Sequence, residues 1–256
     1  MIAIQHLHKS FGKNCVLRGI DLTFDQPGIA AILGPNGSGK TTIIKSILGM
    51  VLPDDGIIRV QGEDIKGKWL YRNQIAYLPQ IARFPENLTV SELIRMVKDL
   101  NTGTAHDEAM ISLFELGPHL DKRLSNLSGG TRQKVNLVLT FMYDCPIIIL
   151  DEPTAGLDPI SMVRLKELIH QQRLLGKTIL ITTHVMSLVE ELADEVVFLL
   201  EGHIHFRGSL KKLEEMTGEA KVERAIASLL ETQVGGIGKP EERRISKPFN
   251  EPTVRA

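Results

Sequence analysis

Cysteine is scarce in this 256-residue chain, and its two residues, Cys15 and Cys145, lie far apart. Small secreted domains held by disulfides carry several closely spaced pairs, so a disulfide scaffold is excluded and a reducing compartment is favoured. Long apolar runs are also missing, because the run at 146–150 is far shorter than the roughly 20 residues that span a bilayer. The N-terminus lacks the basic start and apolar core of a signal peptide. We therefore expect a cytoplasmic protein that reaches a membrane only through a partner chain.

Net charge is also small, since 30 basic and 31 acidic side chains give a formal charge of −1. A marked basic excess is typical of nucleic acid-binding proteins, so we expect no nucleic acid partner. The apolar fraction of 43% and the charged fraction of 24% are ordinary for a folded domain. The length suits one large domain or two small ones.

The segment Gly34–Thr41 matches G-x-x-x-x-G-K-[ST], the phosphate-binding P-loop. An apolar run at 29–33 precedes it and a predicted helix follows it, which is the setting that the motif requires. Glycines let backbone N–H groups turn inward, and the helix N-terminus presents its positive dipole to an anion. Lys40 adds a full charge, and Thr41 supplies a hydroxyl for Mg²⁺. The predicted phosphate-binding residues are Gly34, Asn36, Gly37, Ser38, Gly39, Lys40, Thr41 and Thr42.

Strand and helix patterns alternate along the chain as in an α/β protein with a parallel core sheet. A helical region is predicted from Asn87, with Thr89 as a cap. Trp69 and Tyr71 are expected to pack within the domain, with anchoring of a partner helix as the alternative. Beyond Gly235 the composition is typical of a mobile tail. The predicted strands are 2–4, 17–24, 57–60, 147–150, 178–183 and 195–200, and further predicted helices are 42–48, 160–175, 185–193 and 221–230.

Two carboxylates end the apolar strand at 147–150. Asp151 can hold the shell of a Mg²⁺ ion, and Glu152 can polarise a water for in-line attack on a γ-phosphate, as a general base must. The alternative is a strand that simply stops at solvent with two charges. The P-loop upstream favours the functional interpretation.

A second glycine turn, Ser128-Gly129-Gly130, opens an apolar-striped helix and forms an anion site that has no lysine of its own. One nucleotide does not need two helix N-termini so far apart in the chain. A head-to-tail dimer resolves this, if each turn covers the nucleotide held by the other subunit's P-loop. Arg132 and Lys134 on the same helix are expected on a solvated face, with contact to phosphate or to an interface as the alternative.

In these motifs the chain resembles the ATP-binding cassette family, the nucleotide-binding subunits of ABC transporters, over residues 1–216. The resemblance implies an α/β P-loop NTPase fold with a RecA-like mixed core sheet, an antiparallel β subdomain and an inserted α-helical subdomain near 81–145. Residues 217–256 would be a C-terminal extension. The implied function is ATP hydrolysis with Mg²⁺ by a homodimer that drives a polytopic membrane subunit at the inner face of the cytoplasmic membrane.

The resemblance also implies a role for each matching residue. Phe11 matches the aromatic that stacks on adenine, and Gln80 matches the glutamine that contacts Mg²⁺ and the attacking water. Asp158 lies in the loop that crosses the dimer interface, and His184 matches the histidine that contacts the γ-phosphate. Thr131 departs from the family, which often carries glutamine there. The implied catalytic residues are Glu152, His184 and Gln80, the metal ligands are Thr41, Gln80 and Asp151, and the residues that bind the partner's nucleotide are Ser128, Gly129 and Gly130.

Two longer runs, 77–88 and 127–134, look like those of the NosF-type ATPases. Those proteins work with a membrane subunit and a periplasmic protein in maturing the copper site of nitrous oxide reductase. A drug or lipid exporter ATPase is the main alternative. A soluble ABC ATPase of translation or DNA repair is a further one, but only about fifty residues separate Gln80 from Ser128, which leaves no room for the long insertion of that class.

Overall fold

The computed structural model describes residues 1–234, so the predicted mobile tail beyond Gly235 lies outside the described residues. The strands are β1 (Ile2–Phe11), β2 (Asn14–Phe24), β3 (Gly28–Leu33), β4 (Asp55–Val60), β5 (Glu63–Asp64), β6 (Ile75–Leu78), β7 (Ile147–Asp151), β8 (Thr178–Thr182), β9 (Glu195–Leu200) and β10 (His203–Gly208). One sheet is antiparallel, with the order β2-β1-β4-β5. The other has the order β10-β9-β3-β8-β7-β6 and is parallel except for β10. The predicted mixed core sheet and antiparallel layer are confirmed.

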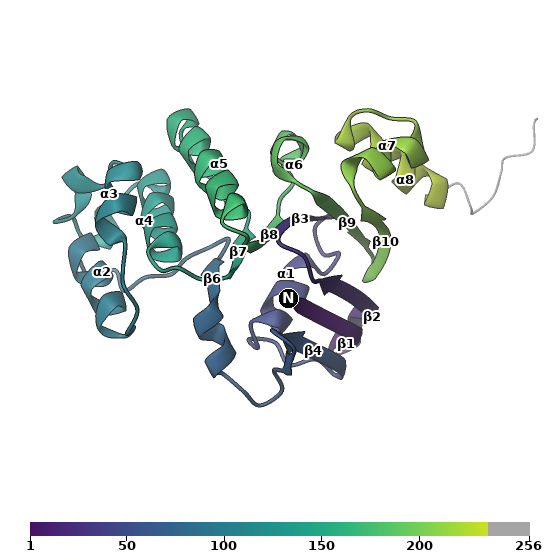
Figure 1. The fold of residues 1–256 in the computed structure, drawn as a ribbon, viewed down its shortest axis with the longest axis horizontal. Helices are drawn as coiled ribbons and strands as arrows, with labels where there is room; N and C mark the ends of the chain where they lie inside the picture. The colour runs from purple at the N-terminus through teal and green to yellow at the C-terminus, as the bar shows by residue number, and fades with distance from the viewer. Residues whose placement is uncertain (235–256) are drawn as a thin grey trace, which may run out of the picture.

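The helices lie at the two ends of the molecule and on both faces of the core sheet, with α1 on the face toward the antiparallel sheet and α5 and α6 on the other side (Figure 1). They are α1 (Lys40–Ile47), α2 (Val90–Asp99), α3 (Asp107–Leu113), α4 (Gly129–Phe141), α5 (Pro159–Leu174), α6 (Met186–Leu192), α7 (Leu210–Thr217) and α8 (Val222–Val234), with short 3-10 turns η1 (Leu70–Gln74), η2 (Gly117–His119) and η3 (Leu124–Asn126). Helices α2, α3 and α4 lie together at one end, and α7 and α8 lie at the other. Within residues 1–234, no helix combines the length and the apolar character that crossing a bilayer requires.

Side chains from the preceding loops fix where several helices begin. Thr89 and Glu92 form a reciprocal capping box, in which Glu92 N–H donates to Thr89 Oγ1 at 3.2 Å and Thr89 N–H donates to Glu92 Oε2 at 2.8 Å. The side chains of Ser128, Asp158 and Ser209 cap α4, α5 and α7, each by accepting a hydrogen bond from a backbone N–H in the first turn of its helix. These bonds satisfy N–H groups that a helix leaves free at its start. The predicted cap at Thr89 is confirmed.

Three buried apolar clusters hold these layers together. The first lies between the two sheets and includes the inner face of α1. The second joins α2 and α4 to the core sheet, and the third seats α7 and α8 on β9 and β10. Strands β7 and β8 are buried on both faces, which is why their sequences are continuously apolar rather than alternating.

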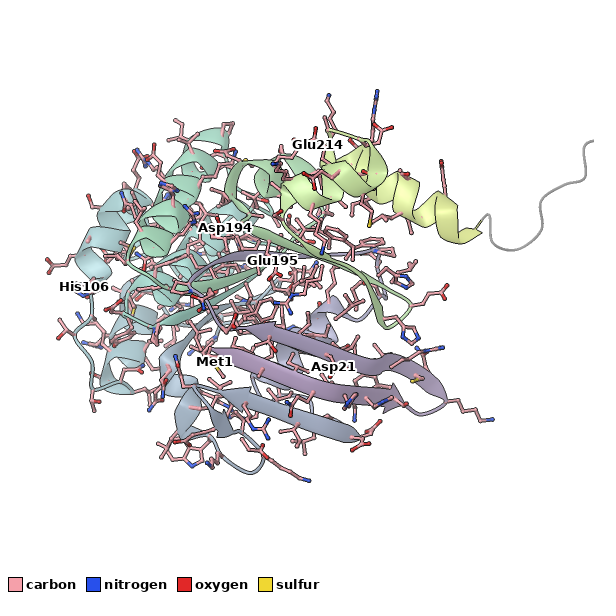
Figure 2. The ribbon with its side chains drawn as sticks, turned by 45° about the vertical axis from the view of Figure 1, so that its right-hand side comes forward. Met1, Asp21, His106, Asp194, Glu195 and Glu214 are labelled. Atoms are coloured by element: carbon pink, nitrogen blue, oxygen red, sulfur yellow. The ribbon has the colours of Figure 1, made fainter. Side chains whose placement is uncertain are left out.

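The β1–β2 hairpin is longer than the sequence predicts. β1 reaches Phe11, and its register against β2 shifts between Ile4 and Leu7, between Leu7 and His8, and between Lys9 and Ser10. Bulges of this kind break the strict alternation by which strands are recognised, so the prediction ended the strand early. Figure 2 shows this sheet from Met1 at the start of β1, with α7 and α8 beyond the core sheet.

The two aromatic residues before β6 have different environments. Tyr71 is buried, and its hydroxyl donates to the Ile47 carbonyl at 3.0 Å. Trp69, one residue before η1, is 63% exposed. The expectation of packing within the domain is correct for Tyr71 and wrong for Trp69, because the 3-10 turn directs only Tyr71 toward the end of α1.

Candidate active site

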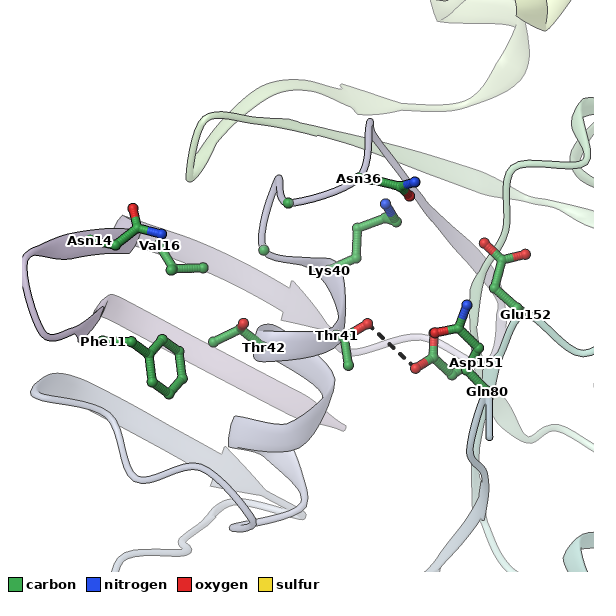
Figure 3. A pocket seen from close by; sticks show the side chains of 12 residues that line it. Phe11, Asn14, Val16, Asn36, Lys40, Thr41, Thr42, Gln80, Asp151 and Glu152 are labelled. Carbon is green, nitrogen blue, oxygen red and sulfur yellow. Dashed lines mark hydrogen bonds between the residues drawn. The ribbon is translucent and has the colours of Figure 1, made fainter. Parts of the chain in front are cut away.

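A cavity of about 420 Å³ lies where β3 and β7 end (Figure 3). Parallel strands end at one edge of their sheet, so the loop after β3 and the carboxylates that close β7 meet there. The cavity therefore joins segments that are more than a hundred residues apart. It is lined by Phe11, Asn14, Val16, Asn36, Gly37, Gly39, Lys40, Thr41, Thr42, Gln80, Asp151 and Glu152.

The P-loop backbone lies tightly against its neighbours. At Gly34 φ is 153°, and a Cβ there would lie 2.1 Å from the Leu199 carbonyl oxygen, so no other residue fits. Gly39 caps the start of α1 at a φ of 110°. The Lys40 ammonium donates to the carbonyls of Gly34 and Pro35 at 2.7 and 3.0 Å. The loop thus curls around the lysine and holds it at the helix N-terminus, where an anion would bind.

Burial affects the charged groups of the cavity in opposite senses. It lowers the pKa of Lys40, although the carboxylates of Glu152 and Asp151 act against this. It raises the pKa of Asp151, although hydrogen bonds from Thr182 and Thr41 act against this. Thr41 Oγ1 lies 3.5 Å from Asp151 Oδ2. A cation bound beside this carboxylate would offset the cost of burying its charge.

Glu152 has a strained backbone and a histidine partner. Its φ is 52°, a left-handed conformation that residues other than glycine rarely adopt, and its N–H donates to the Thr182 carbonyl at 2.9 Å. Its side chain is nearly buried, and Oε2 lies 2.9 Å from His184 Nδ1. The His184 side chain is 79% exposed. Strain of this kind concentrates at functional sites, and here it directs a carboxylate into the cavity.

The oxygen groups beside Thr41 suit a magnesium ion. The Thr41 hydroxyl, the Gln80 amide and the Asp151 carboxylate all face the same cavity (Figure 3). Mg²⁺ prefers hard oxygen ligands, and it commonly uses one or two carboxylates together with phosphate oxygens. These three residues could therefore hold the metal together with a bound triphosphate.

Asn14 and Val16 line the cavity but were not predicted as site residues. The alternating pattern of the sequence predicts a strand at 17–24, whereas β2 begins at Asn14. Asn14 pairs with Phe11 across the two-residue turn of the β1–β2 hairpin. The signal that could have identified them was Gly12, since a glycine in a two-residue hairpin turn places Asn14 opposite Phe11.

The Ser128-Gly129-Gly130 turn and Asp158 lie outside the cavity. Among the described residues, none of these four lines it. Ser128 and Gly129 are exposed at the start of α4. Ser128 Oγ accepts from Thr131 N–H at 3.2 Å and lies 2.9 Å from Thr131 Oγ1. Thr131, the residue that departs from the family, therefore supports the serine. The structure brings the P-loop, Gln80 and the carboxylates together, and it leaves the second glycine turn at the surface.

The first turns of α4 pack against the loop that follows β7. Lys134 Nζ lies 2.8 Å from Asp158 Oδ2, and this pairing holds the pKa of Asp158 well below its usual range. Gln133 Nε2 donates to the Pro153 carbonyl at 3.1 Å, and Arg132 donates to the Leu124 carbonyl at 3.2 Å. The expectation that Arg132 and Lys134 lie on a solvated face is wrong, because both side chains bind groups from other segments.

Gly130→Ala should destabilise this junction, whereas Gly129→Ala should not. A Cβ at Gly130 would lie 2.7 Å from the Gly156 carbonyl oxygen, while one at Gly129 would meet nothing within 4 Å. Overpacking against backbone typically costs about 1–3 kcal/mol. We expect thermal unfolding to show that loss for Gly130→Ala and a change below about 0.5 kcal/mol for Gly129→Ala. Equal stabilities of the two variants would contradict the contact.

The comparisons with known proteins agree on the family. The ABC transporter family model matches residues 17–155. The lantibiotic transport ATP-binding protein SrtF of Streptococcus pyogenes is 33% identical over 224 residues, which is 84% of this chain and 95% of that protein. The ABC-type transporter ATP-binding protein EcsA of Bacillus subtilis is 31% identical, with 85% of this chain and 91% of that protein covered. The Nod factor export ATP-binding protein I of Rhizobium meliloti is 37% identical, with 79% and 62% covered.

Solved structures agree on the fold. An ATP-binding subunit of an ABC transporter superposes with a TM-score of 0.84 at 29% identity, covering 90% of this chain and 99% of that one. A dimeric ATP-binding cassette in a post-hydrolysis state bound to ADP and Pi superposes with a TM-score of 0.73 at 21% identity, covering 82% and 98%. With its P-loop, paired carboxylates and glycine turn arranged as described, the chain belongs to the ABC transporter family, as an ATP-binding subunit with ATPase activity.

Proposed function

We propose that two copies of this chain close over two ATP–Mg²⁺ complexes and open again after hydrolysis. One observation carries the proposal: the cavity that contains the P-loop and the carboxylates contains no residue of the Ser128-Gly129-Gly130 turn, among the residues described. That turn is nevertheless an anion site at the start of a helix, and Ser128 and Gly129 are exposed. In a head-to-tail dimer it completes the site of the other copy.

Each residue of the cavity has a distinct role in this proposal. The Lys40 ammonium and the N–H groups at the start of α1 bind the β- and γ-phosphates. Glu152 accepts a proton from the attacking water, and His184, which lies 2.9 Å from it, holds that carboxylate and contacts the γ-phosphate. Phe11 and Val16 contact the base. Loss of the γ-phosphate removes the charge that bridges the two copies, so the dimer opens.

Magnesium fits the oxygen donors of Thr41, Gln80 and Asp151. When bound, it supplies charge that stabilises the transferring phosphoryl group. The protein residues hold the metal-facing oxygens in place: Thr182 donates to Asp151 from one side, and Thr41 lies on the other.

The proposed partner is a polytopic membrane subunit, since the relatives named above are described as transport or export ATP-binding proteins. We propose that it contacts the helical region at 81–125 and places this chain at the inner face of the cytoplasmic membrane. Closure of the two copies would then move the membrane subunit. The proposed catalytic domain is 1–216, with 217–256 as an extension.

At the finest level we propose a NosF-type role in maturing the copper site of nitrous oxide reductase, with a periplasmic accessory protein as a further partner. It is supported by the similarity of residues 77–88 and 127–134 to that group. Export of another cargo is the second candidate, because the relatives described above include a lantibiotic transporter subunit and a Nod factor export subunit.

The two candidates separate in a deletion strain that carries nitrous oxide reductase. A NosF-type role predicts that the reductase purified from that strain lacks copper, and that the parent gene restores it while a Lys40→Met variant does not. A reductase with its full copper complement would reject the NosF-type role. A polytopic subunit that co-purifies with the chain would still support the general transport function.

A further inference from the structure

Asp54 joins two neighbouring residues of β1 just before Phe11. Lys9 Nζ donates to its Oδ1 at 2.7 Å, and Ser10 N–H donates to its Oδ2 at 2.6 Å. The N–H of Asp54 in turn donates to the His8 carbonyl at 2.9 Å. The turn before β4 therefore clamps the end of β1, and Phe11 is the next residue along the strand.

The ammonium held by this clamp lies over the Phe11 ring. Lys9 Nζ is 5.3 Å from the ring centroid, within the roughly 6 Å over which a cation and an aromatic face attract. The Lys9 side chain is only 15% exposed, and among the described residues it is not part of the cavity lining. Phe11 lines the cavity and is 51% exposed. Lys9 therefore lies against the Phe11 ring without lining the cavity, and about half of the Phe11 surface stays exposed.

The strand pairing around this ring is irregular. The register of β1 against β2 shifts between Lys9 and Ser10, and Phe11 forms the last pair of the hairpin with Asn14. Bulges re-aim side chains next to active sites, and the end of a hairpin has few other restraints. Fixing a mobile side chain when a ligand binds costs conformational entropy and lowers the affinity, whereas a side chain that is fixed beforehand avoids this cost. The Asp54–Lys9 clamp supplies that order.

We propose that Lys9 and Asp54 are positioning residues for the nucleobase, which fix the Phe11 ring as a platform for it. This inference rests on the proposed stacking of the base on Phe11. Asp54 orients Lys9, and the cation draws electron density toward its own face of the ring, which leaves the opposite face poorer in electrons. That face then attracts an electron-rich purine more strongly than an unpaired ring would. Among the described residues, neither Lys9 nor Asp54 lines the cavity in which the phosphates and the attacking water would lie.

Lys9→Met tests the proposal, since it removes the charge and keeps the length of the side chain. We expect KM for ATP to rise roughly 3- to 10-fold while kcat at saturating ATP stays the same. Inhibition by inorganic tripolyphosphate, which has no base, should be unchanged. Asp54→Asn should change KM in the same direction, and Lys9→Arg should restore it, because a guanidinium also stacks on aromatic faces. Lys13→Met, an exposed lysine in the turn of the same hairpin, is the matched control and should behave as the parent.

Phe11→Ala separates failure of this inference from failure of the proposed stacking. If Phe11→Ala leaves KM unchanged, the base does not stack there and the proposed contact is wrong. If Phe11→Ala raises KM but Lys9→Met does not, the stacking stands and the positioning role is overturned. In the Phe11→Ala background, Lys9→Met should have no further effect. Additive effects, or an equal loss of tripolyphosphate binding, would mean that Lys9 acts on the phosphates or the fold instead, and would also overturn the proposal.

Discussion

Glu152→Gln lowers ATP turnover by roughly 10²- to 10⁴-fold and leaves ATP binding intact, if Glu152 is the general base. The amide has the same size as the carboxylate, but it cannot accept a proton from water. Glu152 lines the cavity and is held 2.9 Å from His184, so the substitution changes the chemistry and keeps the shape. Turnover is measured as phosphate release, and binding by equilibrium titration with a fluorescent ATP analogue.

The chain offers a matched control for that substitution. Glu201 also has a left-handed backbone, with a φ of 48°, but it is exposed in the turn between β9 and β10 and does not line the cavity. Glu201→Gln therefore reproduces the chemical change on a similarly strained backbone outside the cavity lining, and its turnover should match that of the parent within about twofold. Parent-like turnover of Glu152→Gln would remove Glu152 from the role of base.

The parts of the site that sequence could predict are those defined by short spacings. Gly34 to Thr41 form one continuous segment that runs from the loop into the start of α1, and Asp151 and Glu152 lie at the end of a buried strand. Parallel strands end at a common edge, so finding two such strands was enough to place these groups together. The capping box at Thr89 was predictable for the same reason, because its partner Glu92 is three residues away.

The parts that were missed depend on contacts between distant segments. The sequence predicts a solvated face for Lys134, because nothing near it in the sequence indicates Asp158, which is supplied by the loop after β7. Lys9 and Asp54 are separated by the whole of β2, β3 and α1. Residue types alone do not predict which residues of two distant segments will be paired. The bulges of β1 also interrupt the alternating pattern by which this strand would be recognised. The exposure of Trp69 was missed because it depends on the 3-10 turn η1, and such short turns have no clear sequence pattern.

Mixing two inactive variants should restore hydrolysis, if each active site takes its glycine turn from the other copy. Lys40→Met removes the charge that binds the phosphates, and Ser128→Arg fills the turn with a bulky cation at an exposed position. Each variant alone should lose at least about 100-fold in turnover, because both sites of its dimer carry the defect. In a mixed dimer, the P-loop of the Ser128→Arg chain meets the intact turn of the Lys40→Met chain, and this one site is undamaged.

An equal mixture should therefore recover up to roughly a quarter of the parental activity, since half of the dimers are mixed and one site in each is intact. Ser125→Arg, three residues earlier and also exposed, is the matched control and should keep parental activity alone. If the turn served the cavity of its own chain, every site in the mixture would carry one defect and the mixture would stay inactive. The geometry favours recovery, because within the described residues the turn lies beside Gly156 and does not line the cavity of its own chain.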